Sequence, residues 1–497
     1  MAHADSPTTT GVTGTARVPL CVDLDETLIR TDLLLESLLL LARQKPLLLL
    51  SLSLWLIRGR AYFKQRIAAA VQFDPELIPY DEEVLSWLHA ERDAGRRIVL
   101  ATASNRRLAE PVAAHVGLFD EVLASDETTN LKGRRKLAKL IERFGRRGFE
   151  YAADARADIP VWREARGAIL VRPAPGVAAA LEGTVPIVRE FPRRSGRVKA
   201  IVKAMRVRQW VKNILVFLPL LAGQSWHQPA LLLKALMVFF ALSLCASSMY
   251  VLNDLLDLPA DRQHRSKRRR PFASGALPIS LGLVLLPGLL IAGLAIAAIA
   301  SRGALGLVIV YVLVTTLYSF WLKRKMLIDV FTLSLLYTLR VLIGSAATGL
   351  LSSPWLLGFS VFTFLSLAAA KRGAELMYSE QSGREGPSGR DYFIWDRQAV
   401  SALGEGAAFG AALVLALYLQ SEQVHVLYAQ PSWLWLLVPL ILYWLTRIWM
   451  LTLRGAMDDD PIVFATTDRL TWIVAALCVL VIAAGTLAPF PLPGAQP

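Results

Sequence analysis

Residues 253–271 read NDLLDLPADRQHRSKRRRP and follow directly on a long apolar stretch. Asp254, Asp257 and Asp261 are three, four and seven positions apart, so on a helix they would share one side, with Asn253 beside them. Three carboxylates this close repel one another unless a cation joins them, and hard oxygen ligands suit Mg²⁺, which bridges substrate phosphates. The alternative is a solvated acidic helix end paired with the arginines that follow. Because ionisable residues inside a membrane are usually functional, we favour a magnesium site.

Apolar stretches surround this motif on both sides. The apolar fraction of 54% exceeds the roughly 45–50% of soluble domains, so part of the chain is expected to lie in lipid. A membrane span needs about 20 apolar residues. Nine candidate spans, of which the first is the weakest, lie at 212–227, 230–252, 279–300, 303–321, 327–350, 354–370, 401–420, 432–452 and 470–489. The sequence therefore predicts an all-α transmembrane bundle of about nine helices.

Basic residues are concentrated in alternate links of this bundle. If the N-terminus is cytoplasmic, the four inner links hold nearly all of them: 253–278, 322–326, 371–400 and 453–469. The positive-inside rule then predicts a multi-pass protein of the cell (inner) membrane whose polar chemistry faces the cytoplasm. These links account for most of the formal charge of +14, so no nucleic-acid partner is needed to explain it. Anionic membrane lipids or a phosphorylated substrate would also be attracted by this positive charge. Residues 1–17 contain no apolar run, so we expect no cleavable signal peptide.

Further polar residues stand near the same ends of the predicted helices. They are Lys212 and Asn213 in RQWVKN, Tyr318 and Lys323 in YSFWLK, Asp329, Arg340, and Lys371 and Arg372 in AKRGAEL. A lone basic residue at a helix end usually anchors a span at the headgroups. Arg340 differs, because it lies inside an apolar span and needs a buried partner. Asp329 is one candidate partner, while both residues could instead face one substrate.

Residues 205–490 resemble the UbiA superfamily of membrane prenyltransferases, through the NDxxDxxxD motif followed by His264, Lys267 and the Arg270-Pro271 pair. Within it the likeness is to the decaprenyl-phosphate phosphoribosyltransferase type. The resemblance implies that Asn253, Asp254, Asp257 and Asp261 bind Mg²⁺ and the donor's pyrophosphate. It also implies that the following residues contact the substrates: Lys212, Asn213, Asn253, Arg262, His264, Lys267, Arg270, Tyr318, Lys323, Asp329, Arg340, Lys371 and Arg372.

The reaction implied by this resemblance moves phosphoribose from 5-phosphoribosyl pyrophosphate to the phosphate of a polyprenyl phosphate. Quinone-type relatives carry a second aspartate-rich motif where this chain has only Asp329, which argues against an aromatic acceptor. Two alternatives stay open. One is a prenyltransferase that moves a prenyl group from a prenyl diphosphate to an aromatic or other small acceptor. The other is a non-catalytic transporter or scaffold. The resemblance also suggests a homo-oligomer.

The N-terminal part of the chain carries a second acidic motif. Residues 18–27 read VPLCVDLDET, an apolar run that predicts a strand ending in Asp23 and Asp25. Ligands bind at the carboxyl ends of strands in open α/β sheets. Asp23 could attack phosphorus while Asp25 protonates the leaving oxygen. Later pieces fit this chemistry: Thr102 after the apolar run RIVLA, Lys136 in LKGRRKLAKL, and Asp154 with Asp158 after YAA.

In this order the pieces resemble the haloacid dehalogenase superfamily of phosphatases over residues 18–185, which implies an α/β Rossmann-like domain with a helical cap. The resemblance implies the following roles: Asp23 as nucleophile, Asp25 as acid and base, Thr102 and Lys136 as phosphate anchors, and Asp154 and Asp158 as Mg²⁺ ligands with Asp23 and Asp25. Ala153 stands where a glycine is usual, so a purely structural domain is the alternative. The apolar stretch 33–57 is cut by charges and Pro46, and we interpret it as cap, one face of which could rest on the membrane.

The sequence therefore predicts a bifunctional enzyme in five segments. These are a disordered N-terminus (1–17), a phosphatase-like domain (18–190, cap about 30–90), a linker (191–204), a transmembrane transferase domain (205–490) and a tail (491–497). The bundle would make a polyprenyl-phosphoryl 5-phosphoribose, and the front domain would remove the 5-phosphate from that or a related product. The three cysteines are far apart, so neither a disulfide framework nor a zinc site is expected.

Overall fold

The computed structural model describes residues 18–193, 196–387, 390–457 and 460–487. The N-terminus and tail that the sequence analysis sets apart, 1–17 and 491–497, lie outside these ranges. The chain divides into two compact units. The first contains residues 1–204 together with 254–283, and the second contains 205–253 and 284–497. The acidic segment that follows Asn253 therefore belongs with the N-terminal part of the chain.

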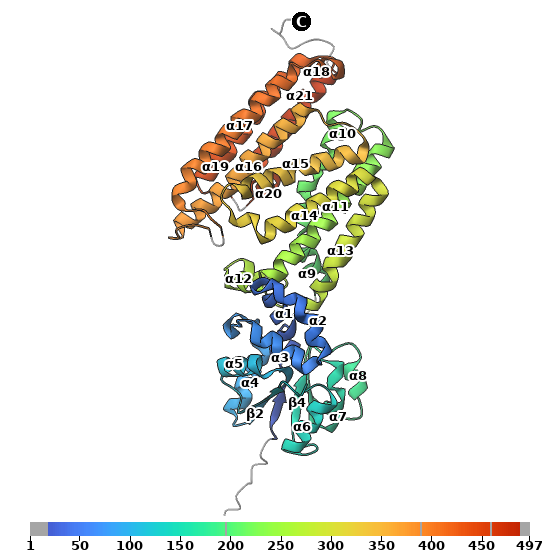
Figure 1. The fold of residues 1–497 in the computed structure, drawn as a ribbon, viewed down its shortest axis with the longest axis vertical. Helices are drawn as coiled ribbons and strands as arrows, with labels where there is room; N and C mark the ends of the chain where they lie inside the picture. Colours follow the sequence, from blue (N-terminus) through green and yellow to red (C-terminus); the bar gives the residue numbers. More distant parts are fainter. Residues whose placement is uncertain (1–17, 194–195, 388–389, 458–459, 488–497) are drawn as a thin grey trace, which may run out of the picture. The chain divides into compact units, whose positions relative to one another are not determined.

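A parallel sheet of six strands forms the centre of the first unit (Figure 1). Its order is β3-β2-β1-β4-β5-β6. The strands are β1 (Leu20–Val22), β2 (Ile98–Asn105), β3 (Glu121–Ser125), β4 (Glu150–Ala153), β5 (Gly167–Val171) and β6 (Ile187–Phe191). Because the strands are parallel, the carboxyl ends of β1, β2 and β4 meet at one edge of the sheet. The predicted acidic groups follow β1 and β4, and the predicted hydroxyl of Thr102 lies in the second half of β2.

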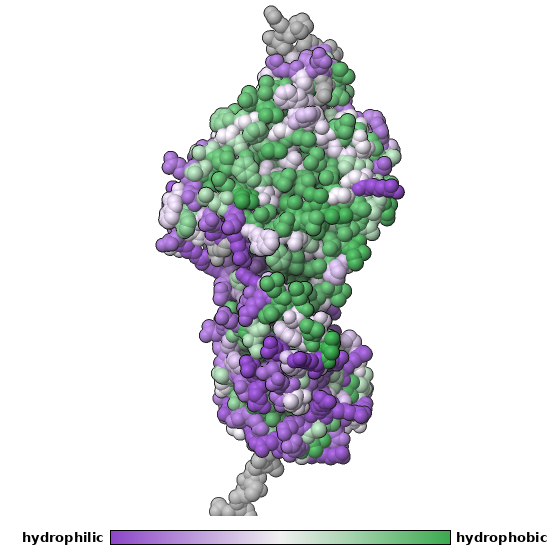
Figure 2. Space-filling view, in the orientation of Figure 1, coloured by the Kyte–Doolittle hydropathy of each residue, from purple (hydrophilic) through white to green (hydrophobic). Residues whose placement is uncertain are grey.

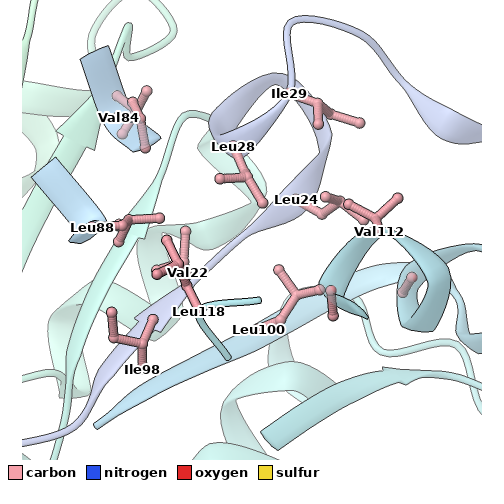
Figure 3. Packing of buried hydrophobic residues seen from close by; sticks show 14 of the residues in the cluster. Val22, Leu24, Leu28, Ile29, Val84, Leu88, Ile98, Leu100, Val112 and Leu118 are labelled. Atoms are coloured by element: carbon pink, nitrogen blue, oxygen red, sulfur yellow. The ribbon is translucent and has the colours of Figure 1, made fainter. Parts of the chain in front are cut away.

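Side chains that alternate along β1 enter two different hydrophobic cores. Leu20 and Val22 join the core beneath α4 (Glu82–Asp93) and α5 (Arg106–Val116), where Leu88 lies near Val22 and Val112 lies near Leu24 (Figure 3). Cys21 enters the opposite core, which is lined from α6 (Arg134–Phe144), α7 (Ile159–Glu164) and α8 (Val177–Leu181). A strand buried on both faces is typical of a parallel sheet covered by helices. This confirms the predicted α/β fold of the N-terminal domain.

The predicted cap consists of four short helices: α1 (Leu33–Gln44), the 3₁₀ helix η2 (Pro46–Ser51), α2 (Leu52–Ile57) and α3 (Arg60–Ala70). Pro46 begins η2 and separates it from α1. The longest of these helices has 12 residues, which is fewer than the roughly 20 that a membrane span needs. Residues 33–57 therefore do not form a membrane span. Another short helix, α9 (Arg197–Ala204), follows β6.

The second unit is a bundle of long apolar helices, and Figure 2 shows its largely hydrophobic surface. Within the described residues, eight helices are long and apolar enough to cross a membrane. They are α11 (Pro229–Leu256), α13 (Ile279–Ala300), α14 (Arg302–Phe320), α15 (Ile328–Thr348), α16 (Pro354–Gln381), Ile394–Leu419 with α17 (Arg397–Leu419), Pro431–Leu453 with α19 (Leu437–Leu453), and α21 (Arg469–Leu487). The chain is a multi-pass membrane protein.

The predicted first span, 212–227, does not form one long helix. It lies in a 3₁₀ helix, η5 (Val207–Phe217), and a short helix, α10 (Leu218–Ala222), so the described residues contain eight long spans rather than nine. Lys212 and Asn213 are buried there, and Pro219 lies in the first turn of α10. A 3₁₀ helix rises about 2.0 Å per residue, so η5 and α10 end to end would extend about 30 Å, close to the thickness of a bilayer core.

Candidate active sites

Three carboxylates meet at the carboxyl edge of the sheet. Asp23 follows β1, and Asp154 and Asp158 follow β4; single oxygen atoms of the three lie within 4.8 Å of one another. Burial, together with the charges of Asp23 and Glu26, raises the pKa of Asp154 to about 8. Burial also raises the pKa of Asp158. Hard oxygen donors that repel one another in this way are a donor set suited to Mg²⁺.

Lys136 lies in the first turn of α6 and points into this cluster. Its Nζ lies 2.8 Å from an oxygen of Asp23 and 3.3 Å from an oxygen of Asp158, and it donates to the hydroxyl of Tyr151 at 2.6 Å. Burial lowers the pKa of Lys136, but Asp23 and Asp158 outweigh this effect and raise it. The lysine is therefore a fixed positive charge beside the nucleophile position. Tyr151 was not among the predicted residues, because a buried strand tyrosine carries no motif signal.

Asp25 is held apart from the three-carboxylate cluster. One of its oxygens accepts from Ser104 Oγ at 2.6 Å, and the other accepts from the amide of Leu33 at 2.8 Å. Burial raises the pKa of Asp25 to about 7, which suits a group that gives and takes a proton near neutral pH. Its predicted role as a metal ligand stays a prediction. The predicted phosphate anchor Thr102 is fully buried, and its hydroxyl accepts from the amide of Ser104 at 3.0 Å.

The acidic segment 253–271 does not form one continuous helix. Helix α11 ends at Leu256, and α12 (Leu258–Gln263) begins after Asp257, with Pro259 in its first turn. Arg270 Nη1 lies 3.2 Å from an oxygen of Asp254 and 2.7 Å from one of Asp261. Asp257 instead lies 3.2 Å from Arg43 Nη1, in α1 of the cap. The expectation that all three aspartates share one side of a helix is wrong, because the helix restarts between them.

Arg262 ties the same segment to the cap. Its terminal nitrogens donate to both oxygens of Glu36, at 3.2 and 2.5 Å, and its Nε donates to the carbonyl of Ala273 at 3.0 Å. Nearby, Gly275 has φ +68° and approaches Arg30 so closely that an added Cβ would lie 2.4 Å from Arg30 Cβ. A predicted contact of Arg262 with substrate would therefore require the Glu36 pair to open.

The other predicted residues of this segment lie nearer its surface. The ring Nδ1 of His264 accepts from the amide of Ser266 at 3.3 Å. Lys267 is exposed and begins the 3₁₀ helix η6 (Lys267–Arg269). The role of His264 and Lys267 in substrate binding stays a prediction.

In the second unit, two predicted lysines converge on one buried aspartate. Lys212 of η5 and Lys371 of α16 lie 2.5 and 3.3 Å from the same oxygen of Asp460. The other oxygen of Asp460 caps α20 (Pro461–Thr467) through the amides of Ile462 and Val463. Asp460 was missed at the sequence level. The Asp460-Pro461 pair is a sequence signal for the start of a helix. Nothing in the sequence indicated that Asp460 also has two lysine partners.

Arg340 is buried inside α15 and its partners are neutral. Its Nε donates to the side-chain oxygen of Asn213 at 3.0 Å, and Nη2 donates to the hydroxyl of Tyr311 at 3.1 Å. The amide of Asn213 in turn donates to Ser243 Oγ at 2.9 Å. Asp329 is thus not the hydrogen-bonding partner of Arg340 in this structure. The guanidinium keeps its positive charge without a paired carboxylate among these contacts.

Asp329 is the centre of a separate ionic cluster. It lies 2.5 Å from Arg372 Nη2 and 3.5 Å from Arg390 Nη1, and it accepts from the hydroxyl of Tyr392 at 2.6 Å. Arg372 also pairs with Glu375. Of the other predicted residues here, the hydroxyl of Tyr318 and the backbone carbonyl of Lys323 accept from Arg390, at 3.4 and 3.5 Å. Arg390 and Tyr392 lie in a polar link, where no motif distinguished them.

Replacing Asp460 by Asn is expected to lower the stability of the detergent-solubilised protein. The substitution leaves the buried charges of Lys212 and Lys371 without their shared counter-ion, a change that typically costs about 3–5 kcal/mol. The midpoint of thermal unfolding in detergent measures the effect. Asp391→Asn, at an exposed position, is the control. An unchanged midpoint for Asp460→Asn would show that this ion pair does not stabilise the bundle.

Comparison with known families identifies both domains. Residues 214–375 match the model of the UbiA prenyltransferase family, and residues 20–163 match that of haloacid dehalogenase-like hydrolases. The chain belongs to the UbiA prenyltransferase family. It is a UbiA-type transferase with an N-terminal haloacid dehalogenase-like domain.

Several relatives of this UbiA chain are known. Protein y4nM of Sinorhizobium fredii is 37% identical over 464 residues, which cover 93% of this chain and 90% of that protein. Nodulation protein NoeC of Azorhizobium caulinodans is 32% identical over 288 residues, or 57% of this chain and 91% of that protein. Decaprenyl-phosphate phosphoribosyltransferase of Mycobacterium tuberculosis is 36% identical over 190 residues, or 37% of this chain and 63% of that enzyme. A UbiA homolog from Archaeoglobus fulgidus, solved with GPP and Mg²⁺, is 14% identical and aligns over 57% of this chain and 98% of its own with TM-score 0.44.

Proposed function

We propose that the helical domain transfers phosphoribose from 5-phosphoribosyl pyrophosphate to a polyprenyl phosphate, and that the N-terminal domain removes a phosphate from the product or a related lipid. The observation that carries the first half is the excess of buried positive charge in the second unit. Lys212 and Lys371 share one carboxylate, and Arg340 has neutral partners. Both substrates of this reaction carry phosphate groups, whereas in the prenyl-transfer alternative only the prenyl diphosphate does. The named phosphoribosyltransferase relatives support the same choice.

The acidic segment is the proposed holder of the donor's pyrophosphate. Asp254 and Asp261 face one guanidinium nitrogen of Arg270, which stands where a cation between the two carboxylates would lie, so the donor set fits a divalent metal. Asn253 and Asp257 are proposed to complete the set. Mg²⁺ bound here and in the N-terminal domain would supply charge neutralisation, for the leaving pyrophosphate and for the phosphoryl group respectively.

The chain's own residues orient the transfer. We infer that Lys212, Lys371 and Arg340 hold the phosphate of the lipid, while Arg270 and the basic residues after Asp261 hold phosphate oxygens of the donor. An oxygen of the lipid phosphate forms the new bond to the anomeric carbon of the ribose, and the bond from that carbon to pyrophosphate breaks. The leaving pyrophosphate carries away the bonding electron pair. This route needs no nucleophile from the protein.

The N-terminal domain has the groups for a covalent phosphatase. A carboxylate oxygen of Asp23 would attack phosphorus, and the leaving alcohol oxygen would take the proton held by Asp25. Asp25 would then accept a proton from the water that hydrolyses the aspartyl-phosphate, which releases phosphate and restores Asp23. Lys136, 2.8 Å from Asp23, would balance the charge of the phosphoryl oxygens. The Asp25 pKa of about 7 suits both proton transfers.

We further propose that both reactions take place at the cytoplasmic face of the inner membrane. The basic links at 257–278, 321–327, 382–393 and 454–468 are separated from one another by pairs of candidate spans, so we infer that all four lie on one side of the membrane. Positive charge marks that side as cytoplasmic.

The first test is a membrane assay with labelled 5-phosphoribosyl pyrophosphate, a polyprenyl phosphate and Mg²⁺. Wild type is expected to move the label into the lipid fraction, as a product without the 5-phosphate, while Asp23→Asn is expected to accumulate the phosphorylated lipid. Label that never enters lipid would contradict the transfer and point to prenyl diphosphates with small acceptors. An Asp23→Asn product with unchanged phosphate content would contradict the phosphatase half alone.

A further inference from the structure

The outer side of the cap is a row of exposed apolar side chains. Leu47, Leu50, Leu54 and Ile57 are 81%, 79%, 64% and 81% exposed. They recur every three or four positions along η2 and α2, so they lie on one side of this helical stretch. We call these four residues the apolar stripe. The opposite side of this helical stretch is packed against the cap, because Trp55 lies in a small core with neighbouring cap residues. An exposed apolar face of this kind marks a surface that meets a membrane or a partner.

A basic pocket begins at the next residue of the chain. It has a volume of about 630 Å³ and lies between the start of α3 and the loop that leads into α6. Five cations and one carboxylate line it: Arg58, Arg60, Lys132, Arg134, Arg135 and Glu127. All six side chains belong to exposed residues, so this is an open pocket with a marked excess of positive charge. Anionic groups such as phosphate suit it.

The basic pocket adjoins the phosphatase site. Arg135 lies next to Lys136 in the first turn of α6. Asn130, which also lines the pocket, accepts from Lys64 Nζ at 3.1 Å. The same Nζ donates to the carbonyl of Ala103 at 2.6 Å, between Thr102 and Ser104. Two hydrogen bonds through Lys64 thus connect the pocket to the end of β2, where Ser104 donates to Asp25.

We propose that the basic pocket binds the phosphate headgroup of a membrane lipid while the apolar stripe lies in the bilayer. The inference rests on the proposed phosphatase function and specifies its substrate class: a lipid that carries a phosphodiester near its tail and a terminal phosphomonoester. The diester occupies the basic pocket, and the monoester reaches Asp23. Lipid is the occupant because the apolar stripe and the pocket are joined at Ile57 and Arg58, and because the chain is a membrane protein. A soluble phosphate compound would need only the cations of the basic pocket and would leave the apolar stripe unexplained.

Contact with the bilayer can be tested without any turnover. The full chain in nanodiscs, carrying a fluorophore at Leu50→Cys, is expected to be quenched by lipids with a nitroxide in the acyl chain. The control is the same fluorophore at Glu142→Cys, an exposed position on α6, where no quenching is expected. Equal quenching at both positions, or none at Leu50→Cys, would overturn the placement of the apolar stripe.

The headgroup site is tested by substrate selectivity. Full-length wild type and Arg58→Glu/Arg134→Glu are compared on polyprenyl-phosphoryl 5-phosphoribose and on p-nitrophenyl phosphate. The ratio of kcat/KM for the lipid over that for the soluble ester is expected to fall at least about tenfold in the variant, mainly through KM, because two charge-assisted contacts are lost. A ratio that does not change would overturn the headgroup site while leaving the phosphatase intact. If wild type hydrolyses neither compound, the proposed phosphatase function fails, and the substrate assignment with it.

Discussion

Replacing Asp23 by Asn is expected to abolish phosphate release by the N-terminal domain, with kcat lowered by a factor of at least about 10³. The carboxylate of Asp23 is the only protein group in the proposed route that forms a bond to phosphorus, and an amide is a far weaker nucleophile. Lys136 would also lose one of its two charged partners. The measurement is release of inorganic phosphate from a labelled phosphomonoester by the full-length protein. Glu142→Gln, at an exposed position on α6, is the matched control.

The neighbouring substitution, Asp25→Asn, separates the two roles. Asparagine cannot give or take the proton, so turnover is expected to fall about 10²–10⁴-fold. The aspartyl-phosphate can still form from an ester with a good leaving group, and it should then persist long enough to be trapped as label on the protein. Asp23→Asn should trap none. Equal labelling of the two variants, or full activity of either one, would contradict the assignment of nucleophile and acid.

The clustering of Asp23, Asp154 and Asp158 at one edge of the sheet could be predicted from the sequence. Asp23 and Asp154 each follow an apolar run that forms a buried strand, while Thr102 lies within β2 near its carboxyl end. Parallel strands bring their carboxyl ends to one edge, so the order of motifs was enough to place these groups together. The sequence did not show that the acidic residues at this edge of the sheet have different contacts. The carboxylate of Asp25 accepts hydrogen bonds from Ser104 and Leu33, and the backbone turns at the next residue, Glu26, which has φ 53°.

The membrane half was predictable in its helices but less so in its polar contacts. Hydropathy identified eight of the nine proposed spans, since a span must be apolar along its whole length. The first proposed span, 212–227, is instead a 3₁₀ helix followed by a short helix, in which Lys212 and Asn213 form tertiary contacts with Asp460 and Arg340. These partners lie more than a hundred residues away. Pairings at such separation depend on how helices pack, and spacing along one helix carries no information about them.

The association of the acidic segment with the cap is the other feature that motifs could not reveal. The predicted boundary near 191–204 divides the chain once, whereas residues 254–283 group with the N-terminal part. Arg262 with Glu36 and Asp257 with Arg43 are the contacts that do this. Each joins a residue of the transferase motif to one of α1. Both cap residues were interpreted from sequence only as charges that interrupt an apolar stretch, since their partners are more than 200 positions away.

Replacing Asp261 by Ala is expected to reduce phosphoribosyl transfer by at least about 10²-fold, because the segment loses one of the two carboxylates that face the same cation position. The loss should appear in the incorporation of labelled 5-phosphoribosyl pyrophosphate into lipid. The milder variant Asp261→Glu keeps the negative charge but moves it. We expect this variant to need a higher Mg²⁺ concentration for its half-maximal rate of transfer. Phosphate release by the N-terminal domain from a soluble ester reports whether the first unit is still folded.

Two comparisons make this prediction specific. Glu422→Gln removes an exposed carboxylate at the start of α18 (Glu422–Leu427) and is expected to leave transfer unchanged. Arg270→Lys keeps a positive charge but replaces the guanidinium, whose Nη1 faces both carboxylates, by an ammonium on a different stem, so it is expected to weaken transfer without abolishing it. If Asp261→Ala retained full transfer and an unchanged Mg²⁺ requirement, Asp254 and Asp261 would be the structural ion pair of Arg270, and the metal would have to be sought among other residues. If Asp261→Glu transfers slowly and excess Mg²⁺ restores its rate, the result would instead show that this carboxylate takes part in metal binding.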